Sequence, residues 1–189
     1  MEATVPGLRS PIVRVVSGSA RGVRIDAPPG RSVRPTSDRV KEATFNALTS
    51  MGVIEDATVV DLFAGSGALG IEALSRGARR VTFVDDAAAP LAAVRQNLAR
   101  TALAAGAEVV RADAMRWAAA GSEPPFDVAL LDPPYDFDQW DALLDAIRAR
   151  VIVVESDRSV AMPERYEVLR ERRYGSTVVI IAELEEPRS

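Results

Sequence analysis

The stretch of the chain that decides its fold is residues 58–70, TVVDLFAGSGALG. It opens with an apolar run that is typical of a buried strand, and it then passes through closely spaced glycines into a helical pattern. Gly65, Gly67 and Gly70 satisfy the spacing G-x-G-x-x-G, in which glycines let the backbone approach a ligand closely. Because a strand precedes the glycines and a helix follows them, the stretch predicts a nucleotide-type ligand in an α/β fold.

Strand and helix patterns alternate on both sides of this stretch. Apolar runs predict strands at residues 58–62, 80–84, 108–111, 126–131 and 151–155. Helical spacing predicts a helix from about residue 39 to 51, and further helices at 68–76, 88–104, 114–120 and 139–150. Residues 166–174 and 177–184 flank Gly175-Ser176 and predict a hairpin. We therefore expect a doubly wound, mostly parallel seven-stranded α/β sheet with a terminal antiparallel hairpin.

The first 41 residues form a basic segment ahead of an acidic remainder. They hold eight cationic side chains, Lys41 among them, and three acidic ones, a net +5, which leaves −9 for the rest of a chain whose net charge is −4. Residues 12–16 and 22–25 predict a small hairpin, and loop signals near residue 35 predict a boundary. We expect a basic extension at 1–35 that meets RNA phosphates through arginines, ahead of a domain at 36–189. A solvated, partly disordered tail is the alternative.

The composition restricts the chemistry. The 189 residues include no cysteine and no histidine, which excludes thiolates, disulfides and imidazoles. The remaining groups suit a reaction whose reactive group arrives on a cofactor, without a metal. No apolar run approaches the roughly 20 residues that span a bilayer, and the first residues lack the apolar segment of a signal peptide. We expect a soluble, cytoplasmic protein with no membrane contact.

Acidic side chains lie at the ends of three predicted strands. Asp61 ends the first, Asp85 lies 20 residues after Gly65, and Asp113 follows the third. An acid beside the glycines repels a pyrophosphate but favours the sulfonium and ammonium groups of S-adenosylmethionine, so Asp61 favours that ligand over a dinucleotide. Asp85 can accept two ribose hydroxyls, and Asp113 the adenine amino group. A strand-end cap at Asp61 and a helix N-cap at Asp113 are the alternatives.

The segment Asp132-Pro133-Pro134-Tyr135 follows the fourth predicted strand. An exocyclic base amine is a poor nucleophile, and acceptors that bind its N–H groups and hold it close to a methyl donor help it react. Asp132 and the Pro133 carbonyl suit that task, because prolines fix the backbone and donate no competing N–H. Tyr135 offers a stacking face to a base that has left its helix. A Pro-rich turn with a surface tyrosine is the alternative.

Several blocks of the chain resemble the RsmD family of small-subunit (16S) ribosomal RNA guanine-N2 methyltransferases, within the class I S-adenosylmethionine-dependent methyltransferases. The blocks are residues 34–42 with Phe45-Asn46, residues 61–78, and residues 14–22, which are similar to the family's first strand and turn. Asp132–Tyr135 is similar to the D/N-P-P-Y/F motif of amino-methyltransferases. The resemblance runs from about residue 12 to Tyr135.

The resemblance implies methyl transfer from S-adenosylmethionine to the N2 amine of a guanine in small-subunit ribosomal RNA, within an assembled or assembling 30S particle. Its implied catalytic residues are Asp132, Pro133 and Tyr135. The implied cofactor-binding residues are Asp61, Phe63, Ala64, Gly65, Gly67, Asp85, Asp113 and Ala114. The implied RNA-binding residues are Arg14, Arg21, Arg34, Thr36 and Arg39. We also expect a monomer.

The chain departs from the family pattern at a few positions. Asp85 stands where the family usually has Glu, Ser17 where it has Gly, and Ser37 where it has Thr, and the segment after Glu155 is short. The nearest competing function is that of a DNA adenine-N6 methyltransferase, for which the basic extension leaves little room for a target-recognition domain. An NAD(P)-linked oxidoreductase would use the same three glycines, and a non-catalytic RNA-binding assembly factor would keep the same pocket.

Overall fold

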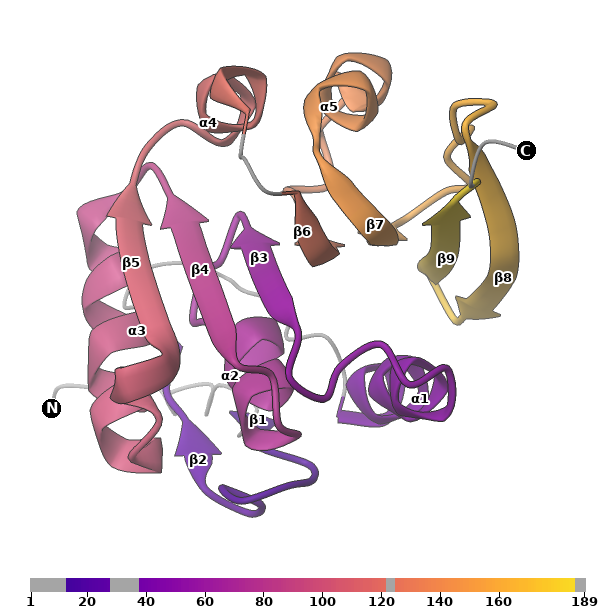
Figure 1. Ribbon diagram of the computed structural model, residues 1–189. Helices are drawn as coiled ribbons and strands as arrows, with labels where there is room; N and C mark the ends of the chain where they lie inside the picture. Colours follow the sequence, from indigo (N-terminus) through magenta and orange to yellow (C-terminus); the bar gives the residue numbers. More distant parts are fainter. Residues whose placement is uncertain (1–12, 28–37, 122–124, 186–189) are drawn as a thin grey trace, which may run out of the picture.

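A seven-stranded sheet of order β5-β4-β3-β6-β7-β9-β8 forms the centre of the computed structural model, which describes residues 13–27, 38–121 and 125–185 (Figure 1). Its strands are β3 (Thr58–Leu62), β4 (Arg80–Asp85), β5 (Ala107–Arg111), β6 (Phe126–Leu131), β7 (Ala149–Ser156), β8 (Tyr166–Tyr174) and β9 (Thr177–Leu184). The strands from β5 to β7 pair in parallel, whereas β9 pairs antiparallel with both β7 and β8. The predicted doubly wound sheet with a terminal hairpin is confirmed.

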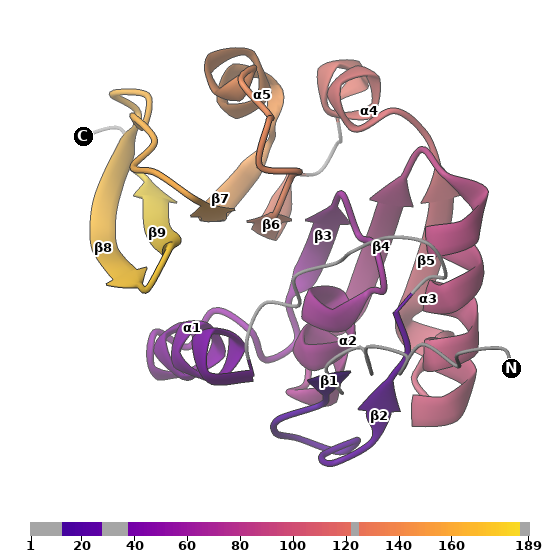
Figure 2. The same ribbon diagram turned by 180° about the vertical axis from the view of Figure 1, so that it is seen from behind.

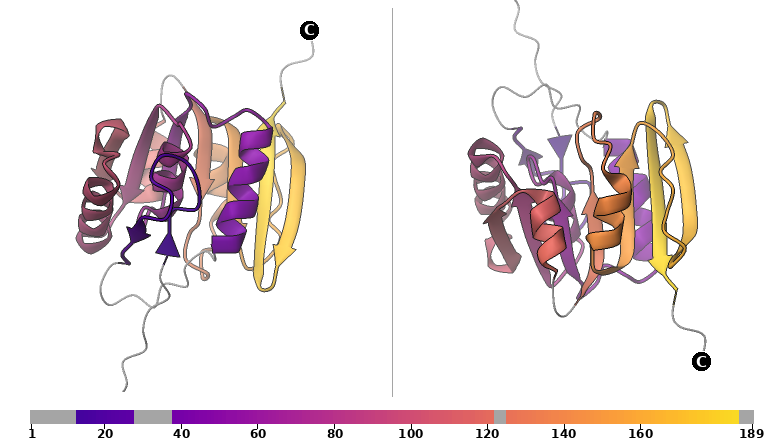
Figure 3. Two further views of the ribbon diagram at one scale, coloured as in Figure 1. Left: turned by 90° about the horizontal axis from the view of Figure 1, so that it is seen from below. Right: turned by 90° about the horizontal axis from the view of Figure 1, so that it is seen from above.

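The two faces of the sheet carry different helices. The helices are α1 (Asp38–Ser50), α2 (Ala68–Ser75), α3 (Ala88–Thr101), α4 (Ala114–Ala120) and α5 (Trp140–Ala146), with a 3-10 turn η1 at Ala104–Gly106. Seen from below, α1 stands in front of the sheet, and seen from above α4 and α5 do (Figure 3). Each face buries its own apolar cluster, with Phe45 and Phe83 in one and Leu143 and Leu144 in the other.

The order of the strands creates a switch point between β3 and β6. From β3 the chain moves outward through β4 to β5, and it then returns to place β6 on the other side of β3. The loops that leave β3 and β6 therefore start side by side at the carboxyl edge of the sheet, with Leu62 paired to Leu131. Open α/β sheets bind ligands at this kind of point.

A small antiparallel hairpin, β1 (Val13–Arg14) with β2 (Arg24–Ile25), lies against the face that carries α2 and α3 (Figure 2). Its prediction is confirmed, with strands shorter than the pattern indicated. The hairpin adds Val13, Val15, Ala20 and Ile25 to the apolar cluster of that face. The predicted boundary near residue 35 lies outside the described residues and stays a prediction.

Two predicted helices end earlier than the pattern indicated. The helix predicted at 139–150 is α5, which stops at Ala146 because Ile147 is extended (φ −67°, ψ 137°) and Ala149 already pairs with Phe126 of β6. The helix predicted at 88–104 is α3, which ends at Thr101 because Ala102 turns to a left-handed conformation with φ 58°. In both cases tertiary pairing or a cap overrides local propensity.

Lys41, counted among the cations of the basic segment, does not add to its surface charge. Its side chain is buried, and its Nζ donates to the Arg14 carbonyl and lies 3.6 Å from Glu72 Oε2. Burial lowers the pKa of Lys41, and the Glu72 carboxylate partly opposes that shift. Lys41 thus links α1 to α2 and to the hairpin, because its ammonium contacts the Glu72 carboxylate and the Arg14 carbonyl, and Asp38 Oδ1 lies 3.8 Å from its Nζ.

Candidate active site

The loop after β3 is held in place largely by its own backbone. Phe63, Gly65 and Gly67 all have positive φ angles, of 62°, 54° and 77°. The Ala64 N–H donates to the Val84 carbonyl of β4 at 3.0 Å, and the Gly67 N–H donates to the Ala64 carbonyl at 2.7 Å. The loop at residues 63–67 is therefore a preformed cradle. It is hydrogen-bonded to the end of β4 and leads directly into α2.

Gly70 sets the distance between α2 and the sheet. A Cβ at this position would lie 2.3 Å from Phe83 Cε1 and 2.9 Å from Val81 Cγ1. Phe83 and Val81 are fully buried, so neither has space to move away. The third glycine of the pattern is thus required for close packing of α2 on the sheet.

Asp61 lies at the base of this loop and is only 2% exposed. Its Oδ2 accepts a hydrogen bond from the Gly70 N–H at 2.9 Å, which ties the end of β3 to the first turn of α2. Burial raises the pKa of Asp61 well above its usual value, the Gly70 N–H opposes that shift, and the negative charges of Asp132 and Asp85 raise the pKa further. Asp61 therefore does not face solvent, and a cation placed beside it would relieve an unfavourable charge.

Asp85 ends β4 and is also buried. Its Oδ2 accepts from the Gly65 N–H and its Oδ1 from the Ala87 N–H, both at 3.0 Å. These two bonds orient the carboxylate at the carboxyl edge of the sheet. Each oxygen retains a second lone pair, so the group keeps the capacity to accept hydroxyl donors.

Asp113 and Ala114 lie at the start of α4, one strand further out. Asp113 is the N-cap of that helix, and its Oδ1 accepts from the Arg116 N–H at 2.8 Å. Ala114 is buried against the α4–α5 face. The helix-capping role is therefore present in the structure, and contact of Asp113 with an adenine stays a prediction.

The Asp132–Tyr135 segment emerges from β6, directly across from the glycine loop. Asp132 is partly exposed, Pro133 is buried, and Tyr135 is 51% exposed. The Phe137 N–H donates to the Pro134 carbonyl at 2.9 Å and closes a turn, and Arg158, just after β7, donates to the Phe137 carbonyl at 2.7 Å. The segment thus presents a carboxylate and an aromatic ring from a braced corner.

A row of aromatic rings connects the two loops. The ring of Phe63, in the glycine loop, meets the edge of Phe137 with 5.4 Å between centroids, and Phe137 meets Trp140 of α5 at 5.1 Å. Edge-to-face contacts of this kind fix the relative position of the rings. The structure therefore brings together the predicted cofactor and catalytic segments, which are about 70 residues apart in the sequence.

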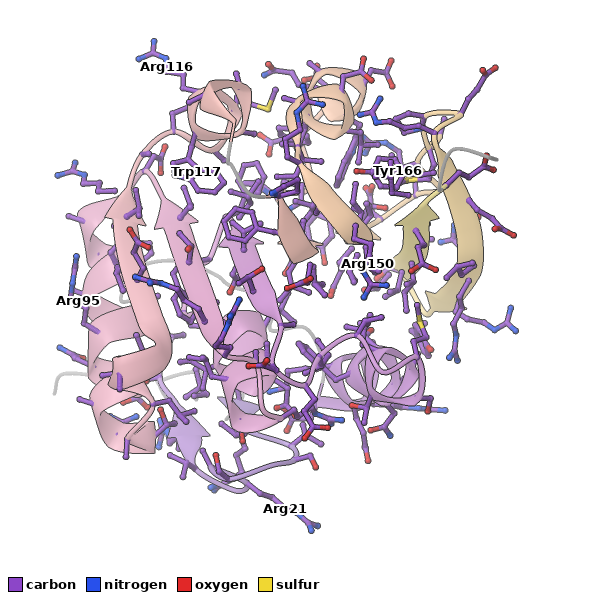
Figure 4. All side chains as sticks on the ribbon, in the orientation of Figure 1. Arg21, Arg95, Arg116, Trp117, Arg150 and Tyr166 are labelled. Atoms are coloured by element: carbon purple, nitrogen blue, oxygen red, sulfur yellow. The ribbon has the colours of Figure 1, made fainter. Side chains whose placement is uncertain are left out.

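Among the predicted RNA-binding arginines, the three that the structure describes come from the β1–β2 hairpin and the start of α1 rather than from the loops at this edge. Arg21 projects from the turn of the β1–β2 hairpin, at the end of the molecule away from the arrowheads of β3, β4 and β5 (Figure 4). Arg14 is exposed and donates to the Gly22 carbonyl at 3.0 Å, and Arg39 is exposed at the start of α1. Arg34 and Thr36 lie outside the described residues.

Two buried polar residues escaped the sequence interpretation. Glu72 of α2 accepts the N–H groups of Val16 and Ser17 at 2.7 and 3.0 Å, and it pairs with Arg76 at 2.8 Å. Asn97 of α3 is fully buried and contacts both the glycine loop and the end of β2. The only local signal for either residue is its position within the buried stripe of a helix. At Asn97 the alanine-rich pattern of α3 hides that stripe.

The residues present fit S-adenosylmethionine by the chemistry of the site. Within the described ranges, the charged groups that act on the buried Asp61 are the carboxylates of Asp132 and Asp85. Negative charge at the carboxyl edge of the sheet disfavours binding of a pyrophosphate and favours binding of a cationic ligand. Asp61 would face the cationic end of the cofactor, and Asp85 would face its ribose. The backbone around Gly65 would let the cofactor approach the loop closely.

The described part of the chain shows neither a metal-binding cluster nor a helix that could span a membrane. Residues 13–27, 38–121 and 125–185 contain no group of three or more acidic side chains arranged to hold a metal ion. Among the helices of these same ranges, none has the length and apolar character needed to cross a bilayer.

The chain matches known proteins along most of its length. The model of the family described as "Conserved hypothetical protein 95" matches residues 13–183. The chain is 42% identical over 181 residues to "Putative rRNA methyltransferase YlbH" of Bacillus subtilis, covering 89% of this chain and 97% of that protein. It is 33% identical over 174 residues to "Ribosomal RNA small subunit methyltransferase D" of Haemophilus influenzae, covering 86% and 89%.

A solved structure agrees with these matches. The fold superimposes on "Putative methyltransferase yhhF from Escherichia coli" with a TM-score of 0.80 and 33% identity, covering 94% of this chain and all of that one. The family match begins at residue 13, so the similarity includes the N-terminal hairpin as well as the sheet.

Proposed function

The chain belongs to the RsmD family, and on this premise we propose that it transfers a methyl group from S-adenosylmethionine to the exocyclic N2 amine of a guanine in small-subunit ribosomal RNA. The substrate we propose is an assembled or assembling 30S particle, and the reaction takes place in the cytoplasm. We propose that the protein acts as a monomer, because every catalytic group in this proposal comes from one chain.

The observation that carries the proposal is the meeting of the glycine loop and the Asp132–Tyr135 segment across the switch point. Asp132 is close enough to Asp61 for its charge to raise the pKa of that buried carboxyl. Leu62 and Leu131, the residues just before the two loops, are paired in the sheet. A methyl donor bound at one loop and an amine bound at the other would therefore meet over adjacent strands.

The chain's own groups position the reactants. When bound, S-adenosylmethionine supplies an electrophilic methyl group on a sulfonium centre. Asp132 accepts one N–H of the guanine amine and the Pro133 carbonyl accepts the other, which localises the nitrogen lone pair toward the donor. Tyr135 stacks on the base, and its exposed ring suits a nucleotide that has been turned out of the RNA. The proton released from nitrogen leaves along the hydrogen bond to Asp132.

Positive side chains of the extension and of α1 supply the contact with the RNA backbone. Arg14, Arg21 and Arg39 are exposed cations on the hairpin and α1, and Arg34 and Thr36 complete the proposed set. Arg21 lies at the end of the molecule away from the carboxyl edge, and this separation fits a large substrate that is held at several points. Phosphate contacts of this kind position the RNA, and the Asp132 segment acts on the base.

The test is methyl transfer from labelled S-adenosylmethionine by the purified chain. The substrates are small-subunit particles from cells that lack the protein, deproteinised 16S RNA from the same cells, and duplex DNA. We expect label in the particles, recovered as N2-methylguanosine by mass spectrometry of nucleosides. The matched control is Asp136→Ala, an exposed acid in the same loop, which keeps activity whereas Asp132→Ala loses it.

Three outcomes would reject the proposal. Label that enters duplex DNA as N6-methyladenine, with none in the particles, identifies a DNA-modifying enzyme. Tight binding of NAD with no binding of S-adenosylmethionine, measured by calorimetry, identifies an oxidoreductase. A particle that binds the chain and is never methylated identifies a non-catalytic assembly factor.

A further inference from the structure

We infer that Asn97 is a positioning residue that couples RNA binding by the N-terminal extension to cofactor binding by the glycine loop. The inference rests on the proposed function, because it takes the extension as the RNA contact and the loop as the cofactor contact. It adds to that function a physical link between the two binding segments, which the buried side-chain amide of Asn97 on α3 provides.

The Asn97 side chain uses all of its hydrogen-bonding groups. Its Nδ2 donates to the Ser66 carbonyl and to the Asp26 carbonyl, both at 2.9 Å. Its Oδ1 accepts from the Asp26 N–H at 3.0 Å. The residue is 0% exposed, so these bonds are shielded from competition with water. Three distant segments of the chain therefore meet at one side chain.

On the loop side, Asn97 holds the middle of the cradle. Ser66 lies between Gly65 and Gly67, and both glycines have positive φ angles, of 54° and 77°. A peptide between two such residues can rotate unless its carbonyl is held. The bond from Asn97 to the Ser66 carbonyl fixes the Ser66–Gly67 peptide in the orientation that carries the Gly67 N–H to the Ala64 carbonyl.

On the extension side, Asn97 holds the last described residues of the hairpin. It binds both backbone groups of Asp26, as a neighbouring strand would. The Asp26 carboxylate is held in turn by Arg100 at 2.7 Å and by Arg24 at 2.9 Å. Asp26 is eight positions before Arg34 in the sequence, and α1 begins four positions after Arg34, so the segment with the proposed RNA-binding residues Arg34 and Thr36 joins Asp26 to α1.

The hairpin has a second attachment that does not involve the loop. Ser75 of α2 accepts the Ala20 N–H at 3.0 Å and donates to the Ser17 carbonyl at 2.6 Å. Gly18 packs so closely there that a Cβ would lie 1.7 Å from the Ser75 carbonyl oxygen. This attachment holds the hairpin to α2 near its turn, whereas Asn97 joins its other end to the cradle.

Coupling follows from this arrangement. RNA bound to the exposed arginines of the hairpin restrains the hairpin and Asp26 with it, and the bonds of Asn97 pass that restraint to the Ser66 peptide. A cofactor that meets an ordered loop binds more tightly, and linkage requires that the cofactor strengthen RNA binding by the same factor. We expect a coupling factor of roughly 5- to 150-fold, the usual range for coupled sites.

The experiment measures that factor directly. Equilibrium dialysis with labelled S-adenosylhomocysteine, which cannot react, gives its Kd with and without saturating undermethylated small-subunit particles. We expect the wild-type Kd to fall at least about fivefold with particles, at the lower end of the usual range. In Asn97→Ser the two Kd values should converge, and the KM for S-adenosylmethionine at saturating RNA should rise more than kcat falls.

Two matched variants separate coupling from simple docking. Ser75→Ala weakens the attachment that lies away from the loop, so RNA affinity should fall while the coupling factor persists. Gln96→Ala removes an exposed amide next to Asn97 on the same helix and should leave both quantities unchanged. A wild-type coupling factor of one, or an unchanged factor in Asn97→Ser, would overturn the inference.

A second measurement protects the test if Asn97→Ser does not fold. Hydrogen exchange of the wild-type chain should show slower exchange in the peptide spanning residues 63–67 when particles are added without cofactor, and unchanged exchange there would reject the coupling. Failure of the proposed function would look different, because the wild type would then methylate no particle at all.

Discussion

The two loops at the switch point of the sheet are built in opposite ways. The glycine loop after β3 is held by hydrogen bonds at Ala64, Gly65, Ser66 and Gly67, and its base, Asp61, is buried. The Asp132–Tyr135 segment after β6 contains two prolines that fix its backbone, and it leaves Tyr135 51% exposed. This difference fits the proposed function, in which the glycine loop binds a small cofactor and the exposed segment receives a base carried by a large RNA.

The largest expected effect separates the roles of the two loops. Asp132→Ala should lower kcat by roughly 10²- to 10⁴-fold, the contribution typical of a group that handles a proton at the reacting atom. The Kd for S-adenosylmethionine should change little, because the cradle after β3 remains intact. Single-turnover methyl transfer alongside calorimetry checks both values, and an unchanged rate would remove Asp132 from the catalytic assignment.

The next effect tests the platform. Tyr135→Ala should weaken binding of the target base by about 1–3 kcal/mol, the usual worth of stacking on an aromatic ring. Tyr135→Phe keeps the stacking face and should keep activity. The KM for small-subunit particles measures this difference. If Tyr135→Phe lost as much as Tyr135→Ala, the hydroxyl rather than the ring would carry the role.

A third prediction tests the packing that supports the cradle. Gly70→Ala places a methyl group 2.3 Å from Phe83 and should destabilise the fold by about 1–3 kcal/mol, the usual cost of overpacking. Urea denaturation measures the free energy of unfolding. A variant as stable as wild type would show that α2 can move off the sheet, in which case cofactor affinity should fall instead.

The smallest expected effect concerns the charge of Asp61. Asp61→Asn keeps an acceptor for the Gly70 N–H but removes the charge, so the Kd for S-adenosylmethionine should rise roughly 10-fold, equivalent to ~1.4 kcal/mol. Because the pKa of Asp61 is raised in the fold, the folded state holds its proton more tightly than the unfolded state does.

The sign of the pH dependence follows from that difference. The wild type without cofactor should lose stability as pH rises from the usual value of 3.8 up to the raised pKa, and Asp61→Asn should lack this loss. Above the raised pKa the variant should therefore be the more stable of the two. Thermal melts across pH measure this, and tighter cofactor binding by Asp61→Asn would contradict the proposed charge pairing.

Much of the fold can be predicted from the sequence because the patterns that specify its strands, helices and turns lie among neighbouring residues. The glycine stretch, the apolar strands and the Gly175-Ser176 turn each predict an element from neighbouring residues, and the sheet and both hairpins are confirmed. The ends of α3 and α5 were misplaced because a left-handed cap at Ala102 and the pairing of Ala149 with Phe126 are decided by packing.

Residue types and their spacing were enough to define the chemistry open to this protein. With no histidine or cysteine in the chain, the acids at the strand ends, the glycine spacing and Asp132–Tyr135 stood out from the sequence alone. Folding then established what those residues do to one another. It buried Lys41 beside Glu72, raised the pKa of Asp61 by desolvation and neighbouring charge, and joined the extension to the cradle through Asn97. Such effects depend on burial and on contacts between residues far apart in the chain, and local pattern does not encode either.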